Sequence, residues 1–341
     1  VTKIEVIPDS SKTHWVNRAP VGIRPYLQLS RLDRPVGYWL LALPGWIGLA
    51  FAGLSHGLVW TDLVWAGLIL IGAIAMRGAG CTYNDIVDQD LDAQVARTAL
   101  RPLPAGSVTT RQAWIWLFIQ VGIGFCVWLC LPLFAKLVAL GSIPLVAAYP
   151  FMKRITWWPQ IWLGLTFNWA FLVAVAIKTG GVNIPALVFY LGLIFWTVGY
   201  DTIYAMQDVE DDAMIGVKST ARRFGKFIKP AVLACYSICT YLITSASVAE
   251  VFWRGTPHED KLGLILTDEI IYSAPLIAPF FLILLWQVIT LKKGDNRNAL
   301  FRFKSNFAAG LVLIGLLLFT GHILDNYRVE YERVRSAALT P

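Results

Sequence analysis

Long apolar runs recur along almost the whole sequence, and they constrain the fold more than any other feature. Only 15% of the 341 residues are charged and 57% are hydrophobic, whereas a soluble domain carries roughly 25% charged residues. A helix needs about 20 mostly apolar residues to cross a bilayer, and lipid admits only helices or closed barrels. We therefore predict an all-α, polytopic integral membrane protein. The nine expected spans are residues 36–54, 62–83, 112–131, 134–150, 161–178, 184–205, 230–249, 271–291 and 307–324. The third and fourth meet near Pro132 and should form a tight helical hairpin.

The Lys and Arg residues between the spans predict how the chain is oriented. Most of them fall in the N-terminal segment and in the loops on its side of the membrane, which favours a cytoplasmic N-terminus. The sequence divides into a cytoplasmic N-terminal segment (1–35), a nine-helix transmembrane domain (36–325) and a C-terminal tail (326–341). No signal-peptide pattern is expected in the first segment, and its early Glu5 and Asp9 disfavour a transit peptide. This topology accounts for the net charge of +7, so we expect no nucleic-acid partner.

Two acidic stretches follow apolar spans on the expected cytoplasmic side. The first, YNDIVDQDLD (83–92), ends the second span, and the second, DTIYAMQDVEDD (201–212), ends the sixth. In the first stretch Asn84, Asp88 and Asp92 are four residues apart, so on one helix they would share a face. The corresponding face of the second stretch carries Asp201, Tyr204, Asp208 and either Asp211 or Asp212.

Carboxylates stacked one helical turn apart repel each other unless a cation lies among them. Oxygen ligands of this kind favour Mg²⁺, which commonly takes one or two carboxylates and completes its shell with phosphate oxygens and water. Each stretch also leads into a basic loop, RTALRPLPAG or GVKSTARRFGK, whose side chains can neutralise a diphosphate. Two solvated helix ends are the alternative. The shared spacing and side of the two stretches favour a Mg²⁺–diphosphate site between them.

Other polar residues in apolar surroundings leave two interpretations open. Arg77 lies inside the second span, where a charge is costly; it either pairs with a nearby aspartate or anchors an anionic substrate. The stretch YPFMKRIT, which begins at Tyr149, closes the fourth span, and its Lys153 and Arg154 either set the topology or belong to the site. Asn168, in the middle of the fifth span, either bonds a neighbouring helix or contacts the substrate.

Five stretches carry a resemblance to a known family. NDIVDQDLD fits the NDxxDxxxD pattern of the UbiA prenyltransferase superfamily, and YAMQDVEDDAMIGVKST resembles its second aspartate motif. RLDRPVGYWLLALPGW, RTALRPLPAG and YPFMKRITWWPQ are similar to the branch that makes ubiquinone precursors, the 4-hydroxybenzoate polyprenyltransferases. The likeness extends over about residues 24–325. The stretch ARRFG (221–225) departs from the pattern, in which apolar residues follow ST.

The resemblance implies nine transmembrane helices around a central cavity, with two aspartate-rich motifs at an active site that faces the cytoplasm or the mitochondrial matrix. The implied Mg²⁺ ligands are Asn84, Asp88, Asp92, Asp208 and Asp212. The expected catalytic residues are Asp88, Asp92, Asp208, Asp212 and Asp201. The candidate diphosphate contacts are Lys153, Arg101 and Lys218. Arg77 or Arg154 would hold the carboxylate of an aromatic acceptor. The remaining candidate substrate contacts are Tyr149, Asn168 and Tyr204.

The implied reaction is Mg²⁺-dependent transfer of a polyprenyl group from polyprenyl diphosphate to the ring carbon ortho to the phenol of 4-hydroxybenzoate, in ubiquinone biosynthesis. An allylic C–O bond ionises, the ring carbon attacks, and a proton leaves to Asp201, Asp212 or the diphosphate itself. The polyprenyl tail would enter from membrane lipid. Another aromatic acceptor is one alternative. An ion-coupled transporter is another, although transporters place their ion sites near the bilayer midplane. The expected location is a bacterial inner (plasma) membrane, or the mitochondrial inner membrane in a eukaryote.

Overall fold

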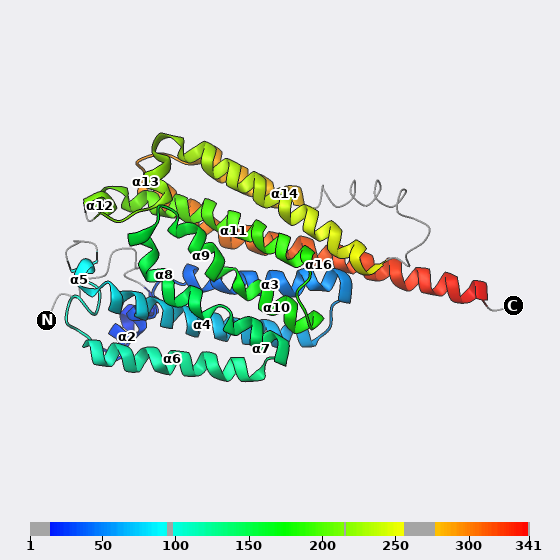
Figure 1. The fold of residues 1–341 in the computed structure, drawn as a ribbon, viewed down its shortest axis with the longest axis horizontal. Helices are drawn as coiled ribbons and strands as arrows, with labels where there is room; N and C mark the ends of the chain where they lie inside the picture. Colours follow the sequence, from blue (N-terminus) through cyan, green and yellow to red (C-terminus); the bar gives the residue numbers. More distant parts are fainter. Residues whose placement is uncertain (1–13, 94–97, 215, 256–276, 340–341) are drawn as a thin grey trace.

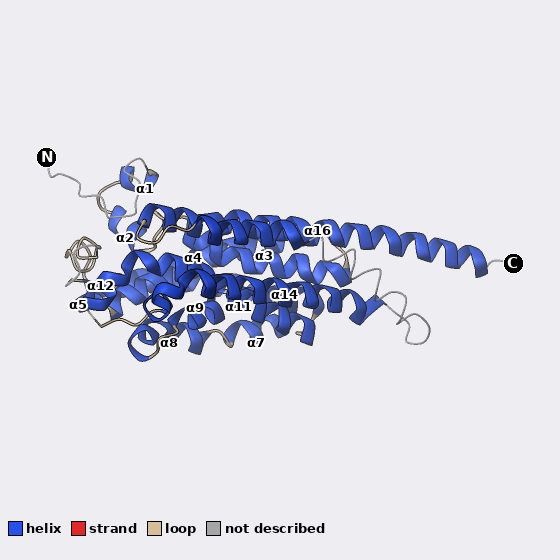
Figure 2. Cartoon of the chain, turned by 90° about the horizontal axis from the view of Figure 1, so that it is seen from above, coloured by secondary structure: helices blue, strands red, loops and turns tan. Residues whose placement is uncertain are grey.

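The computed structural model describes residues 14–93, 98–214, 216–255 and 277–339. Within these ranges the chain forms helices and no strand, and the long helices run side by side along one axis (Figures 1 and 2). Two short helices, α1 (Trp15–Arg18) and α2 (Arg24–Leu29), precede the bundle. The predicted all-α fold is thus confirmed for the part of the chain that is described.

Eight of the described segments are long and apolar enough to cross a membrane. Their helices are α3 (Val36–His56), α4 (Thr61–Val87), α6 (Thr110–Cys130), α7 (Leu133–Leu140) with α8 (Ile143–Ile155), α9 (Pro159–Phe167) with α10 (Trp169–Thr179), α11 (Ile184–Ala205), α14 (Ile228–Gly255) and α16 (Asn296–Leu339). The expected span 271–291 begins outside the described residues, and its described part is a shorter apolar helix, Ile277–Thr290. The last span is longer than the predicted 307–324, because hydropathy marks only the apolar middle of α16.

Two of the predicted spans are each built from two consecutive helices. The predicted hairpin at Pro132 is confirmed, since α6 ends just before this residue and α7 begins just after it. The fourth predicted span, 134–150, is itself interrupted between Leu140 and Ile143. The cause is Pro144, which has no N–H to donate to the carbonyl of Leu140. The chain therefore bends in the middle of the bundle before α8 leads to its basic end.

Asn168 separates α9 from α10 and is only 1% exposed. Its Nδ2 donates hydrogen bonds to the carbonyl of Gly164 (2.8 Å), the carbonyl of Leu193 (3.2 Å) and Oγ1 of Thr197 (2.8 Å). The last two acceptors belong to α11, so Asn168 joins the two helices. Of the two interpretations of Asn168, the bond to a neighbouring helix is confirmed, and the residue does not line the cavity described below.

Replacing Asn168 with leucine should lower the free energy of unfolding by about 1–2 kcal/mol, the range of a hydrogen bond between membrane helices. Thermal unfolding of the purified protein in detergent measures this loss. The exposed Asn326 of α16 offers a matched control, and Asn326→Leu should cost clearly less. Equal stability of the two variants would contradict a bridging role for Asn168.

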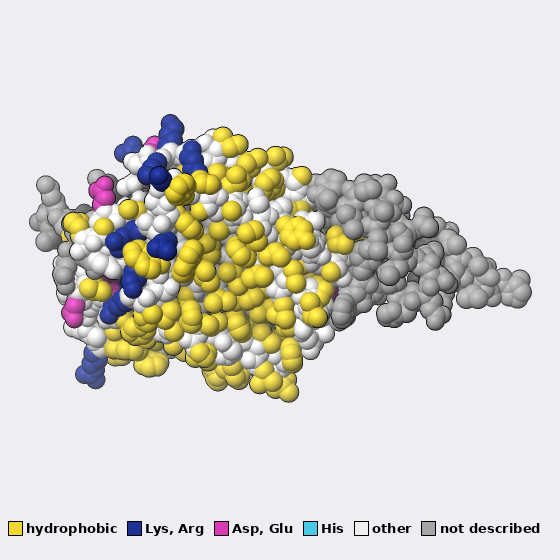
Figure 3. Space-filling model, turned by 45° about the horizontal axis from the view of Figure 1, so that its top comes forward, with side chains coloured by type: hydrophobic (Ala, Val, Ile, Leu, Met, Phe, Trp, Pro, Cys, Tyr) yellow, Lys and Arg dark blue, Asp and Glu magenta, His cyan; other side chains and the backbone are white. Residues whose placement is uncertain are grey.

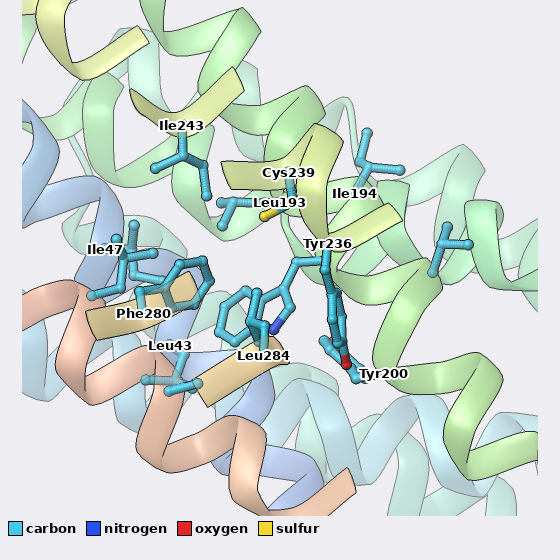
Figure 4. Packing of buried hydrophobic residues seen from close by; sticks show 14 of the residues in the cluster. Leu43, Ile47, Leu193, Ile194, Tyr200, Tyr236, Cys239, Ile243, Phe280 and Leu284 are labelled. Atoms are coloured by element: carbon cyan, nitrogen blue, oxygen red, sulfur yellow. The ribbon is translucent and has the colours of Figure 1, made fainter. Parts of the chain in front are cut away.

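The hydrophobic core lies between α3, α10, α11, α14, α16 and the helix Ile277–Thr290 (Figure 4). At its centre the ring of Trp196 meets Phe280 edge to face, with centroids 5.3 Å apart, and its Nε1 donates to Oδ1 of Asn306 at 2.8 Å. The helices α4, α6 and α8 lie beside this core and bury few of their residues. A cavity therefore forms between them and the core.

Charged and apolar side chains are separated on the molecular surface. The face in Figure 3 is broadly apolar, and its Lys and Arg side chains gather at one end. Both acidic stretches lie at one end of the bundle, as predicted, where Figures 1 and 2 show α5 and α12 close together. The short helices of this end are α5 (Gln89–Asp92), η1 (Met206–Asp208), α12 (Val209–Met214), α13 (Thr220–Phe224) and η2 (Gly225–Phe227).

Candidate active site

An elongated cavity of about 850 Å³ lies inside the bundle. Its polar end is lined by residues of both acidic stretches, Asp85 from the first and Asp201 from the second. Away from this end its walls are mostly apolar and come from α3, α4, α6, α8 and α10. The lining follows α4 back to Trp65, a distance of roughly 30 Å at ~1.5 Å per residue. This shape suits a molecule with a charged head and a long apolar body.

The helix that carries the first acidic stretch is interrupted at Asp88. This residue caps α4 with φ −100° and ψ 7°, and α5 starts after it. Asn84, Asp88 and Asp92 therefore do not belong to one regular helix, although the N–H of Asp88 still donates to the carbonyl of Asn84 (2.9 Å) and the N–H of Asp92 to that of Asp88 (2.8 Å). Their shared face stays a prediction. The Asp88 carboxylate is 1% exposed and pairs with Lys153 and with Arg154, whose Nη2 lies 2.7 Å from Oδ1. These two cations come from the end of α8.

A second group of ion pairs holds the neighbouring aspartates. Asp85 pairs with Arg31 at 2.7 Å and with Arg101 at 3.3 Å, and Arg101 reaches Asp92 at 2.6 Å. Burial raises the pKa of Asp92, and the charge of Arg101 opposes that rise. Arg101, predicted as a diphosphate contact, thus bridges two carboxylates while lining the cavity.

Arg31 is a site residue that the sequence analysis missed. It lines the cavity, and its backbone is left-handed, with φ 54°, a conformation uncommon for residues other than glycine. The preceding Ser30 fixes this turn, since its hydroxyl donates to Oε1 of Gln120 at 2.9 Å and accepts from Nε1 of Trp116 at 2.8 Å. The signal was present in the stretch RLDRPVG, where cations directly precede the first span.

The second acidic stretch approaches the cavity with only its first half. Asp201 and Tyr204 of α11 line the polar end, and the Tyr204 ring packs on Phe303 of α16 with centroids 4.5 Å apart. Asp208 follows in η1, and Asp212 lies one turn further in α12. Neither residue lines the cavity. We call the charged residues of the two acidic stretches, of the end of α8 and of the following loop that lie outside the lining the rim; they are Asp88, Asp92, Lys153, Arg154, Asp208, Asp212 and Lys218. The stretch is therefore a helix with a 3-10 interruption, and the predicted continuous face is corrected.

Lys218 connects the two halves of the rim. Its backbone N–H donates to the carbonyl of Lys153 at 2.9 Å, and its Nζ donates to the carbonyl of Ile155 at 3.1 Å. The loop after the second acidic stretch is thereby fastened to the end of α8. In this arrangement Lys218 positions the loop, and its diphosphate contact stays a prediction.

Arg77 and Tyr149 line the cavity close to its polar end, as do Asn84 and Arg101. The Arg77 guanidinium lies over the ring of Phe167, 5.4 Å from its centroid. Within the described residues Arg77 forms no ion pair, and its buried Nε has no hydrogen-bond partner. The predicted pairing of Arg77 with an aspartate is therefore not formed. Arg154 differs, because it pairs with Asp88 and does not line the cavity.

Among the described residues, no three His, Cys, Asp or Glu side chains converge as a ready-made metal centre. Of the predicted ligands, Asn84 lines the cavity, whereas Asp88 and Asp92 are held by basic side chains at its rim. The donor set still fits Mg²⁺, since it offers carboxylate and amide oxygens only. Oδ2 of Asp85 is also buried without a hydrogen-bond partner within the described residues.

A helical bundle with eight apolar segments long enough to cross a membrane, around a cavity that ends between acidic and basic side chains, defines a multi-pass membrane protein. Residues 40–311 match the model of the UbiA prenyltransferase family. The chain belongs to this family, as its motifs predict.

Two similar proteins have the name 4-hydroxybenzoate polyprenyltransferase, mitochondrial. The one from Aedes aegypti is 40% identical over 301 residues, which cover 87% of this chain and 63% of that protein. The chain thus spans less than two thirds of the mosquito protein. The one from Homo sapiens is 48% identical over 315 residues, covering 91% of this chain and 78% of that protein.

The fold is also similar to that of a solved archaeal protein. A UbiA homolog from Archaeoglobus fulgidus, bound to GPP and Mg²⁺, superimposes with a TM-score of 0.61 at 21% identity, covering 88% of this chain and 99% of that chain. At this identity the similarity concerns the fold. It agrees with the all-α bundle around a cavity that the sequence predicts.

Proposed function

We propose that this protein transfers a polyprenyl group from polyprenyl diphosphate to the ring carbon ortho to the phenol of 4-hydroxybenzoate, releasing diphosphate, in ubiquinone biosynthesis. The observation that carries the proposal is the cavity, roughly 30 Å long in all, in which a polar end with Arg77, Asp201 and the first acidic stretch continues into an apolar body. The names of the two similar proteins support the choice of donor and acceptor.

The charged rim would bind the diphosphate head of the donor. Mg²⁺, held by oxygens of Asn84, Asp88, Asp92, Asp208 and Asp212, would supply positive charge for the departing diphosphate when bound. Lys153, Arg154 and Arg101 are close enough to the same carboxylates to turn toward phosphate oxygens. Fixed cations of this kind stabilise the leaving group most where water is excluded.

The acceptor would lie between the rim and the apolar body. Arg77 is our candidate for its carboxylate, because the guanidinium lines the cavity and forms no ion pair within the described residues. Tyr149 and Tyr204 would position the aromatic ring. Asp201, on the same wall as Tyr204, is our candidate to accept the proton that leaves the ring carbon when the C–C bond has formed. The apolar body would hold the polyprenyl tail and keep water from the allylic cation.

The test is an assay of the full chain in liposomes with Mg²⁺, labelled 4-hydroxybenzoate and polyprenyl diphosphates of several lengths. We expect labelled prenylated product and one diphosphate released per product molecule. Homogentisate and dihydroxynaphthoate serve as alternative acceptors in parallel reactions. Product from one of these and none from 4-hydroxybenzoate would contradict the proposed acceptor while keeping the reaction class.

Replacing Arg77 with lysine should raise the KM for 4-hydroxybenzoate and change the KM for the donor little. Lysine keeps the charge but loses the planar fork that binds a carboxylate through two hydrogen bonds. Loss of a charge-assisted hydrogen bond worth about 1.5–3 kcal/mol corresponds to a roughly 10- to 150-fold higher KM for 4-hydroxybenzoate. Arg154→Lys is the comparison, and it should alter the donor KM instead. The opposite pattern would assign the acceptor to Arg154.

The membrane that contains the protein is a further part of the proposal. The eight apolar segments make it a multi-pass membrane protein. Of the two locations predicted, the names of the similar proteins favour the mitochondrial inner membrane. They give no support to a bacterial plasma membrane.

A further inference from the structure

Arg77 is held in place by two residues of other helices that bear no charge. Gly37, in the first turn of α3, lies directly beneath the guanidinium. A Cβ at this position would stand 2.8 Å from Nε, 3.2 Å from Nη2 and 3.4 Å from Cζ of Arg77. Real Cβ atoms essentially never approach another heavy atom within 3.0 Å. The guanidinium therefore occupies space that only glycine leaves open.

The other side of the guanidinium faces an aromatic ring. Phe167, the last residue of α9, lies with its ring centroid 5.4 Å from Cζ of Arg77, within the range of a cation–π contact. Gly37, Arg77 and Phe167 all line the cavity. The charge is thus held between a backbone and a ring. Asp201 is near enough to interact with it electrostatically, but the two form no ion pair. A carboxylate partner would fix the side chain equally well, but it would compete with an anionic ligand.

We infer that Gly37 and Phe167 are positioning residues that hold Arg77 in the geometry needed to bind the acceptor's carboxylate. The inference rests on the proposed function, in which Arg77 is the acceptor's anchor. With this inference the acceptor site includes two uncharged residues, Gly37 of α3 and Phe167 of α9. Phe167 takes this place because α9 ends there, at the break that Asn168 makes.

The decisive variant is Gly37→Ala in the full chain, reconstituted in liposomes. Alanine is the better helix former, and the atoms it would strike are the end of a flexible side chain, so the guanidinium should move and the protein should fold. We expect the KM for 4-hydroxybenzoate to rise roughly 10-fold, the loss of one charge-assisted hydrogen bond. The kcat and the donor KM should stay within about twofold.

Gly53→Ala is the matched control on the same helix. A Cβ there would meet Cδ2 of Leu58 at 2.7 Å, an equally close contact with a flexible side chain, and neither residue lines the cavity. This variant should leave both KM values unchanged. Phe167→Leu, which keeps an apolar side chain but loses the ring face, should raise the acceptor KM about 2- to 10-fold, as expected for a cation–π contact.

A double mutant separates positioning from general damage. When Arg77 is already methionine, Gly37→Ala should cause no further rise in the acceptor KM, because nothing remains to be displaced. A full additional rise would overturn the inference. If Arg77→Met raises the acceptor KM and Gly37→Ala alone does not, the positioning role fails while the anchor stands. If Arg77→Met leaves the acceptor KM unchanged, the anchor and its positioning residues are both overturned.

Discussion

Replacing Asp88 with alanine should lower kcat/KM by on the order of 10³-fold or more, and Asp208→Ala should do the same. Asp88 pairs with two cationic side chains, Lys153 and Arg154. Its loss would remove a proposed metal ligand and release two cations together. Asp208 lies in η1, directly after α11, and its loss would remove the part of the proposed site that the second acidic stretch contributes.

Asp62→Ala is the matched control for these variants. Asp62 lies in the first turn of α4, at the opposite end from Asp88, and it also forms an ion pair, with Lys178. Its loss should affect stability and leave turnover nearly unchanged. The double variant of Asp88 and Asp208 should be little worse than either single one, because residues that act as a unit lose their effect together. Near-normal turnover of either single variant, correctly inserted in the membrane, would show that the two stretches do not form one site.

Chelation of divalent metal should abolish product formation, and added Mg²⁺ should restore it. The rim offers oxygen donors, and the diphosphate brings more negative charge than Lys153, Arg154 and Arg101 can balance while they remain paired with aspartates. The measurement is turnover in EDTA, in EDTA with excess Mg²⁺, and in EDTA already saturated with Ca²⁺. Undiminished turnover in excess EDTA would mean that the basic side chains alone neutralise the leaving group.

The spans could be predicted from the sequence because each depends on a local property, the apolar content of about 20 consecutive residues. The breaks at Pro144 and Asn168 were harder to predict. Proline inside a membrane helix is tolerated when neighbouring helices supply the lost hydrogen bonds, and the partners of Asn168 on α11 are 25 or more residues away in sequence. Hydropathy contains no information about such partners.

The sequence could predict which charged residues gather at the candidate site, but it could not predict which of them pair with one another. The order of the spans correctly indicated that the two acidic stretches lie at one end of the bundle. It could not indicate that Asp85 pairs with Arg31, because that pair joins residues 54 positions apart through a left-handed turn. Nor could it show that Lys218 fastens a loop, since its acceptors are backbone carbonyls, which every residue has.

The pairing of Asp88 with Lys153 and Arg154 has a consequence for the order in which ligands are admitted. A metal ion alone would have to displace two cations from a buried carboxylate and leave them without counter-ions. A diphosphate alone would draw the cations away and leave the carboxylate bare. Only when both arrive does every charge find a partner, so each ligand should raise the affinity for the other by the same factor. In the proposed function, the rim would therefore favour a complete metal–diphosphate head over either half.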